Sequence, residues 1–124
     1  MKMGSQLLAN MKTATDAFVQ FERVKKSYDG ISPVVKDLNM AMPMGEFLTM
    51  LGPSGSGKST MLHLLGGLDR PTSGQVVIDG VNISELDDEA ATLTRRAKTG
   101  FVFQFFHLVP RMSAFENVEL PLVL

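Results

Sequence analysis

The sequence predicts an α/β fold in which an antiparallel β layer lies beside the α/β core, and three observations predict it. Residues 18–24 and 34–42 each alternate apolar with polar side chains, as half-buried strands do. Residues 46–68 read as a short apolar run, a glycine-rich loop and a stretch with leucines at helical spacing. Strand-like and helical patterns then alternate along the remaining residues, an order typical of α/β domains.

The first half of the chain predicts a hairpin followed by a strand, a loop and a helix. Asp29-Gly30 is a turn signal between the first two strands, which are therefore expected to pair antiparallel. The apolar run at 46–51 predicts a fully buried central strand. A helix is expected over 58–68, where Gly66-Gly67 weakens its end.

The second half predicts a strand at 75–78, a helix over about 88–98, a buried strand at 101–103 and a final helix. Asp87 or Asp88 is expected to cap the helix at 88–98. The final helix is expected to begin after Ser113, because Ser113 and Glu116 have the spacing of a capping box.

Composition limits the classes of protein that the chain can represent. Its 124 residues suffice for one domain, and we expect a leader at 1–15 before a domain at 16–124. The net charge of −1 argues against an electrostatic nucleic-acid binder. Because the chain has no cysteine, a disulfide framework or a thiolate metal site is excluded. The sequence contains no run of about 18 apolar residues, which is the length that a membrane-spanning helix needs.

The glycine-rich loop carries the chemistry, because residues 52–59 match the pattern G-x-x-x-x-G-K-S of a phosphate-binding loop. Glycines let the backbone turn its N–H groups toward an anion, and the following helix adds its positive end. Lys58 would supply a full charge to the β- and γ-phosphates, Ser59 a hydroxyl to Mg²⁺, and Thr60 a donor to the α-phosphate. The sequence therefore predicts a nucleoside triphosphate site, most simply for ATP. Its residues are Gly52, Pro53, Ser54, Gly55, Ser56, Gly57, Lys58, Ser59 and Thr60.

This loop alone does not separate kinases, GTPases, recombinases and transporter ATPases, but its surroundings do. The loop is followed by Leu-Leu-Gly-Gly-Leu-Asp-Arg-Pro-Thr-Ser-Gly-Gln-Val, and later by Phe-Val-Phe-Gln at 101–104. With these segments the chain resembles the nucleotide-binding domain of an ABC transporter from about residue 17 to 124, which implies a P-loop NTPase core. Residues 17–55 are similar to polyamine-importer ATPases and 61–124 to the lipoprotein-release and macrolide-export branch. We favour the export branch, since its stretch is longer.

The resemblance implies further roles and partners. Tyr28 matches the aromatic residue that stacks on adenine, and Gln104 matches the glutamine that reaches Mg²⁺ or the attacking water. ATP and Mg²⁺ are the implied cofactors, with Ser59 and Gln104 on the metal. The implied partners are a membrane-spanning permease and a second ATPase domain, as a homodimer or a pair, with no nucleic acid. The implied location is cytoplasmic, on the inner face of the inner membrane.

The resemblance also implies parts that these 124 residues do not contain. The family continues into a helical subdomain with a Leu-Ser-Gly-Gly-Gln signature, a Walker B strand and a switch histidine. The acidic group at 87–89 is no substitute, because it suits a helix cap rather than the end of a buried strand. We therefore expect an ABC ATPase truncated before its helical subdomain, which binds nucleotide and hydrolyses it negligibly. The alternative is a non-catalytic ATP-binding or regulatory module, or a truncated gene product.

Two groups of side chains each have two possible interpretations. The basic cluster of Arg95, Arg96 and Lys98 suits an exposed helix face better than a nucleic-acid patch. The apolar side chains of Phe105, Phe106 and Leu108 suit either core packing or contact with the permease.

Overall fold

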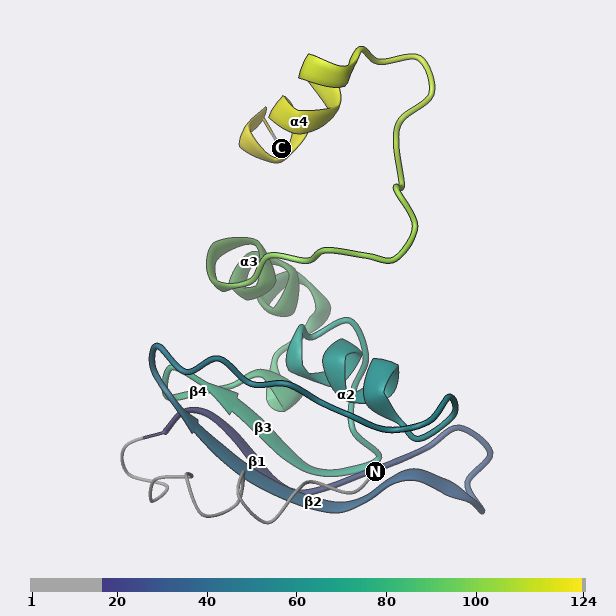
Figure 1. Ribbon diagram of the computed structural model, residues 1–124. Helices are drawn as coiled ribbons and strands as arrows, with labels where there is room; N and C mark the ends of the chain where they lie inside the picture. Colours follow the sequence, from purple (N-terminus) through teal and green to yellow (C-terminus); the bar gives the residue numbers. More distant parts are fainter. Residues whose placement is uncertain (1–16, 124) are drawn as a thin grey trace.

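A computed structural model describes residues 17–123, and the leader predicted at 1–15 lies outside the described residues (Figure 1). A four-stranded sheet forms one layer, and helix α2 lies over one of its faces (Figure 1). Helix α3 follows beyond α2, and helix α4 lies farthest from the sheet at the end of an extended segment (Figure 1).

The sheet is antiparallel throughout and has the strand order β2-β1-β3-β4. Strands β1 (Ala17–Ser27) and β2 (Pro33–Pro43) form the hairpin that the alternating patterns predict. Strand β3 (Ser73–Ile78) pairs with the other edge of β1 and begins two residues before the predicted strand at 75–78. The short strand β4 (Val81–Asn82) was not predicted. The antiparallel layer of the predicted fold is thus confirmed.

The hydrophobic core lies between the sheet and α2. Val19 and Phe21 of β1 are buried two positions apart, as a strand requires, and a register shift between Phe21 and Val24 then brings Val24 to the buried side as well. Helix α2 covers the core with two fully buried side chains. The buried apolar residues are Val19, Phe21, Val24, Val35, Met40, Met61, Leu64, Val76 and Ile78. This packing fixes the start of α2 relative to β2.

The helices begin where the sequence predicts, and one ends earlier. Helix α2 (Lys58–Leu65) stops before the predicted residue 68 because Gly66 caps it and Gly67 has a φ of 69°. A short 3₁₀ helix, η2 (Ile83–Glu85), precedes α3 (Asp88–Lys98), which has the predicted bounds. Asp87, rather than Asp88, is the N-cap of α3.

Helix α4 (Ala114–Val123) opens with the predicted capping box. The Ser113 hydroxyl accepts from the Glu116 N–H at 3.1 Å, and the Glu116 carboxylate accepts from the Ser113 N–H at 2.7 Å. These reciprocal bonds satisfy two backbone donors that the first helical turn leaves without partners. The capping prediction is confirmed.

Two predicted strands, at 46–51 and 101–103, are wrong. Both segments are irregular, and Val102 is fully exposed. A strand needs a hydrogen-bonded neighbour, and no sheet formed by residues 17–123 includes either segment. Leu48 and Met50 nevertheless pack against the core, while Phe47 and Leu51 point outward at 92% and 79% exposure. The segment at 46–51 therefore has the alternation of a strand without its pairing.

Replacing Asp87 with alanine is expected to destabilise α3 locally by about 1 kcal/mol. The Asp87 carboxylate accepts from the Ala90 N–H at 2.7 Å, and no other side chain caps this end of the helix. Amide hydrogen exchange of residues 88–92 would measure the loss. Asp88→Ala is the matched control, since Asp88 contacts Arg70 instead of the cap; equal effects of the two variants would contradict the assignment.

Candidate functional site

The loop before α2 borders an open cavity of about 470 Å³. It is lined by consecutive residues of the predicted phosphate-binding loop and by one residue of β2, namely Val34, Ser54, Gly55, Ser56, Gly57, Lys58, Ser59 and Thr60. Of the predicted loop residues, Gly52 and Pro53 lie outside this lining. The sequence did not single out Val34, because a valine near a turn carries no signal of its own.

The glycines of the loop adopt conformations that other residues rarely adopt. Gly55 and Gly57 have φ values of 79° and 94°. A Cβ atom on Gly57 would lie 3.0 Å from the Val34 carbonyl oxygen, so glycine also permits the close approach of the loop to β2. The loop and the first residues of β2 are therefore one local structure.

The N-terminus of α2 faces this loop without a side-chain cap. Gly57 is the N-cap and accepts the first helical hydrogen bond, from the Met61 N–H at 2.9 Å. The first N–H groups of a helix have no partner within the helix, and no side chain supplies one here. Such a helix end, with its partial positive charge, can hold an anion such as a phosphate group.

Lys58 folds back over the loop. Its ammonium group donates to the carbonyl oxygens of Gly52 and of Pro53, the latter at 2.9 Å, and approaches the Ser56 hydroxyl at 3.5 Å. The lysine charge is thus held at the loop by flexible contacts to neutral acceptors, and a phosphate would be a stronger acceptor for it.

The loop residues suit a Mg²⁺ ion that is held mainly by the phosphates of a bound nucleotide. Ser59 and Thr60 line the cavity. Within residues 17–123, no three acidic, histidine or cysteine side chains are grouped to hold a metal. Because Mg²⁺ is usually held by few protein oxygens plus phosphates and water, a hydroxyl at this position fits such an ion when phosphate is bound.

The two remaining predicted site residues do not line the cavity. Gln104 lies exposed in the irregular segment between α3 and α4. Tyr28 follows the last residue of β1, at the turn end of the hairpin, and is 62% exposed. Strand β2 starts five residues later and contributes Val34 to the cavity, so Tyr28 and the loop lie at the same end of the hairpin.

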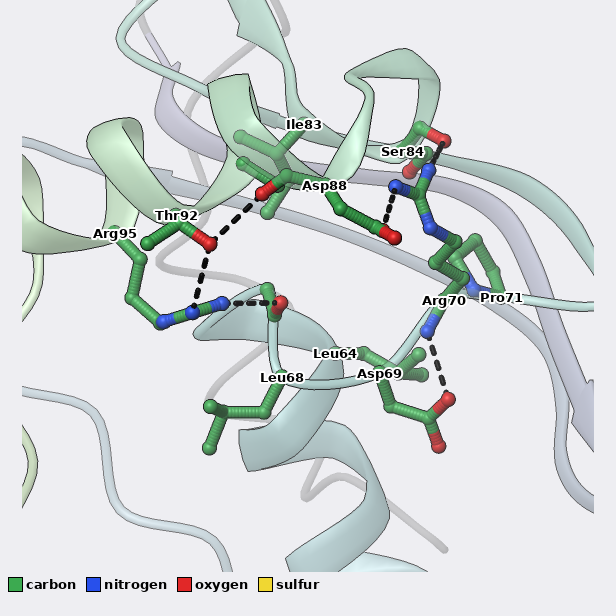
Figure 2. Close-up of a pocket in the computed structure, with 12 residues that line it drawn as sticks. Leu64, Leu68, Asp69, Arg70, Pro71, Ile83, Ser84, Asp88, Thr92 and Arg95 are labelled. Atoms are coloured by element: carbon green, nitrogen blue, oxygen red, sulfur yellow. Dashed lines mark hydrogen bonds and ion pairs between the residues drawn. The ribbon is translucent and has the colours of Figure 1, made fainter.

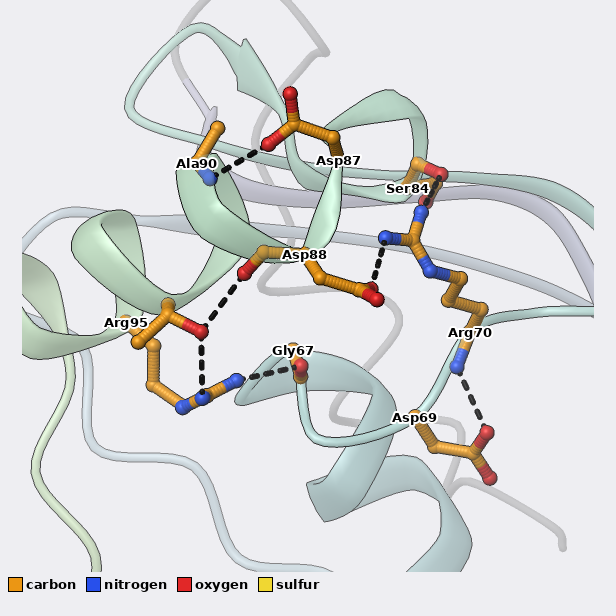
Figure 3. A network of polar contacts seen from close by, with 9 residues as sticks. Gly67, Asp69, Arg70, Ser84, Asp87, Asp88, Ala90 and Arg95 are labelled. Carbon is orange, nitrogen blue, oxygen red and sulfur yellow. Dashed lines mark hydrogen bonds and ion pairs between the residues drawn. The ribbon is translucent and has the colours of Figure 1, made fainter.

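A second cavity, of about 270 Å³, lies between the end of α2, η2 and the start of α3 (Figure 2). The Arg70 guanidinium donates to the Ser84 carbonyl at 3.1 Å and to Asp88 at 3.2 Å, and Arg95 donates to the Gly67 carbonyl at 2.9 Å (Figure 3). These contacts tie α3 to the end of α2. Arg95 was predicted on an exposed face, and the structure instead gives it this docking contact.

The pattern and geometry of the loop before α2 are typical of P-loop nucleotide-binding proteins, and comparison with known proteins narrows the class. A family model described as "ABC transporter" matches residues 35–121. The chain belongs to the family of ABC transporter ATP-binding proteins.

Several curated relatives are similar over most of this chain. An uncharacterized ABC transporter ATP-binding protein of Methanocaldococcus jannaschii, MJ0796, is 48% identical over 85% of the chain and 46% of its own length. The lipoprotein-releasing system ATP-binding protein LolD of Anaeromyxobacter dehalogenans is 45% identical over 85% of the chain and 45% of its own length. The macrolide export ATP-binding/permease protein MacB 1 of Yersinia pestis is 42% identical over 86% of the chain and 17% of its own length. The chain thus spans slightly less than half the length of MJ0796 and LolD, and a smaller share of MacB 1.

Solved structures confirm the P-loop NTPase fold. A dimeric MJ0796 cassette matches with a TM-score of 0.79 at 48% identity, covering 85% of this chain and 47% of the cassette. A post-hydrolysis state of the same cassette, bound to ADP and Pi, matches with a TM-score of 0.79 at 49% identity. None of the helices formed within residues 17–123 has the length and apolarity that crossing a membrane requires.

Proposed function

We propose that the chain binds ATP with Mg²⁺ as the N-terminal part, residues 16–124, of an ABC transporter ATP-binding domain. The observation that carries this proposal is the N-terminus of α2, which lacks a side-chain cap and follows a glycine loop around a cavity of about 470 Å³. An anion at this position would meet unpaired N–H groups and the Lys58 charge together.

Four of the predicted residues have specific roles in this proposal. Lys58 would exchange its carbonyl contacts for phosphate oxygens, and the hydroxyl of Ser59 would bind Mg²⁺. Bound Mg²⁺ would neutralise phosphate charge. Tyr28 would stack on adenine from the turn end of the hairpin. Gln104 would bind the metal from the segment between α3 and α4, although it does not line the cavity.

The proposed partners are a membrane-spanning permease and a second ATP-binding domain. Support comes from the dimeric form of the similar cassette and from the relatives named for lipoprotein release and macrolide export. The proposed location is the cytoplasmic face of the inner membrane, where the chain would associate peripherally. The export branch is favoured over import by the names of these relatives.

We further propose that the 124-residue chain hydrolyses ATP negligibly, because its sequence contains no Leu-Ser-Gly-Gly-Gln signature and no strand formed within residues 17–123 ends in Asp-Glu. Calorimetric titration is expected to show saturable, Mg²⁺-dependent ATP binding, while phosphate release stays at the level of buffer. Steady-state turnover that disappears in Lys58→Ala would show that the chain is an active ATPase. Binding without turnover also fits a regulatory module.

A further inference from the structure

Tyr28 is held by contacts to a loop far from it in the sequence. Its hydroxyl donates to the Asp69 carboxylate at 2.9 Å. Asp69 lies in the loop that follows α2, and 41 positions separate the two residues. The ring at the turn end of the hairpin is therefore attached to the loop that follows the C-terminal end of α2.

Lys26 completes the cluster. Its ammonium group donates to the other oxygen of Asp69 at 3.0 Å and to the Arg70 carbonyl at 2.7 Å, and it lies 4.9 Å from the centre of the Tyr28 ring. The Lys26 side chain is only 13% exposed and that of Asp69 29%. One ring face thus carries a cation, and the exposure of Tyr28 leaves ring surface open to solvent.

Neighbouring contacts hold the loop and the end of β1 together. The Thr72 N–H donates to the Lys25 carbonyl at 2.8 Å, and the Ser27 N–H donates to the Thr72 hydroxyl at 3.0 Å. On the other side of Tyr28, the Asp29 carboxylate accepts from the N–H groups of Ile31 and Ser32. The backbone before and after Tyr28 is fixed, so the direction of the ring depends on the hydroxyl contact with Asp69 and on the Lys26 ammonium over the ring.

We propose that Asp69 is a positioning residue that orients the Tyr28 ring for stacking on the adenine of the bound nucleotide, while Lys26 covers the opposite ring face. This inference rests on the proposed function, which assigns adenine to Tyr28. A ring held in its binding orientation loses less rotational freedom when the base stacks on it, and affinity rises accordingly.

The charge state of Asp69 suits this role. Burial raises the pKa of the Asp69 carboxyl, but hydrogen bonds from Lys26, the Arg70 N–H and Tyr28, together with the Lys26 charge, lower it by more. The net pKa lies below the ordinary value of 3.8, so the group is a carboxylate at neutral pH and accepts from the phenol and the ammonium at once.

The test uses the full 124-residue chain, ATP and inorganic triphosphate, which has no base. Tyr28→Phe keeps the ring and removes the hydroxyl contact, and Asp69→Ala removes the acceptor. Each is expected to weaken ATP binding roughly three- to ten-fold, the range of one hydrogen bond, and to leave triphosphate binding unchanged. The double variant is expected to lose no more than either single one. Asp79→Ala is the matched control, because Asp79 also pairs with a lysine at 3.0 Å but lies in the β3–β4 turn.

A spectroscopic readout separates positioning from folding. Tyr28 is the only tyrosine and the chain has no tryptophan, so ultraviolet emission excited at wavelengths that phenylalanine does not absorb comes from this ring. A carboxylate hydrogen-bonded to a phenol quenches emission, so Asp69→Ala is expected to emit more strongly and with lower anisotropy than the unchanged chain.

Two results would overturn the inference, and they differ in what else they overturn. If Tyr28→Ala weakens ATP binding while Tyr28→Phe and Asp69→Ala do not, the positioning role fails and the adenine role stands. If the unchanged chain does not bind ATP, or Tyr28→Ala binds it equally well, the adenine role fails and the positioning role fails with it.

Discussion

Replacing Lys58 with alanine is expected to weaken ATP binding by the 124-residue chain about 10- to 100-fold, which corresponds to a charge-assisted hydrogen bond of about 1.5–3 kcal/mol. The ammonium of Lys58 already lies at the loop, where it donates to the Gly52 and Pro53 carbonyls. Phosphate oxygens would replace these neutral acceptors, so the variant loses the full charge nearest to the polyphosphate.

Calorimetric titration at fixed ionic strength would measure this loss of affinity. Raising the salt concentration is expected to reduce the difference in ATP affinity between Lys58→Ala and the unchanged chain, because salt screens the lysine charge. Lys98→Ala is the matched control, because Lys98 lies in α3 and pairs with Asp79 away from the loop. Equal affinity of Lys58→Ala and the unchanged chain would show that the loop does not hold the phosphates.

Replacing Gly74 with alanine is expected to destabilise the fold by about 2–4 kcal/mol. This figure adds the cost of a left-handed backbone conformation at a non-glycine residue to the cost of a steric overlap. Gly74 has a φ of 82°, and a Cβ atom there would overlap the backbone of Glu22 and Arg23 in β1. This contact lies where the pairing of β1 and β3 shifts register between Glu22 and Lys25. Backbone atoms at such a place cannot move aside cheaply.

Chemical denaturation followed by circular dichroism would measure the change in the free energy of unfolding. Gly80→Ala is the matched control: Gly80 has a φ of 77° in the β3–β4 turn, and a Cβ atom there would meet no atom within 4 Å. The control is expected to lose about 1 kcal/mol for the strained conformation alone. If Gly74→Ala loses no more than Gly80→Ala, the close packing of β3 on β1 is not what requires glycine.

The sequence predicted those parts of the fold whose signals are local. The hairpin of β1 and β2 follows from alternation over 18–24 and 34–42, and the start of α3 follows from its capping residue. The segment at 46–51 was misjudged for a physical reason. Its apolar run predicted a strand buried on both faces, but only Leu48 and Met50 pack against the core. An apolar run does not report whether a neighbouring strand is present to accept its hydrogen bonds.

The site could be predicted only where one short segment supplies it. The pattern at 52–59 identified the loop, and the structure places most of it around one cavity. The contact between Tyr28 and Asp69 joins residues 41 positions apart, and no spacing rule connects a tyrosine after a strand with an aspartate after a helix. Val34 reaches the cavity through sheet geometry, which depends on the β1–β2 register.

The outward side chains of the segment at 46–51 also bear on every measurement named above. Phe47 and Leu51 offer apolar area that water solvates poorly, and the backbone between them has hydrogen-bonding groups outside any sheet. Two such surfaces on different molecules gain free energy by meeting, and the gain grows with the logarithm of protein concentration. Association through these surfaces would make a dissociation constant or melting temperature of this chain depend on protein concentration, so a dilution series belongs beside each variant.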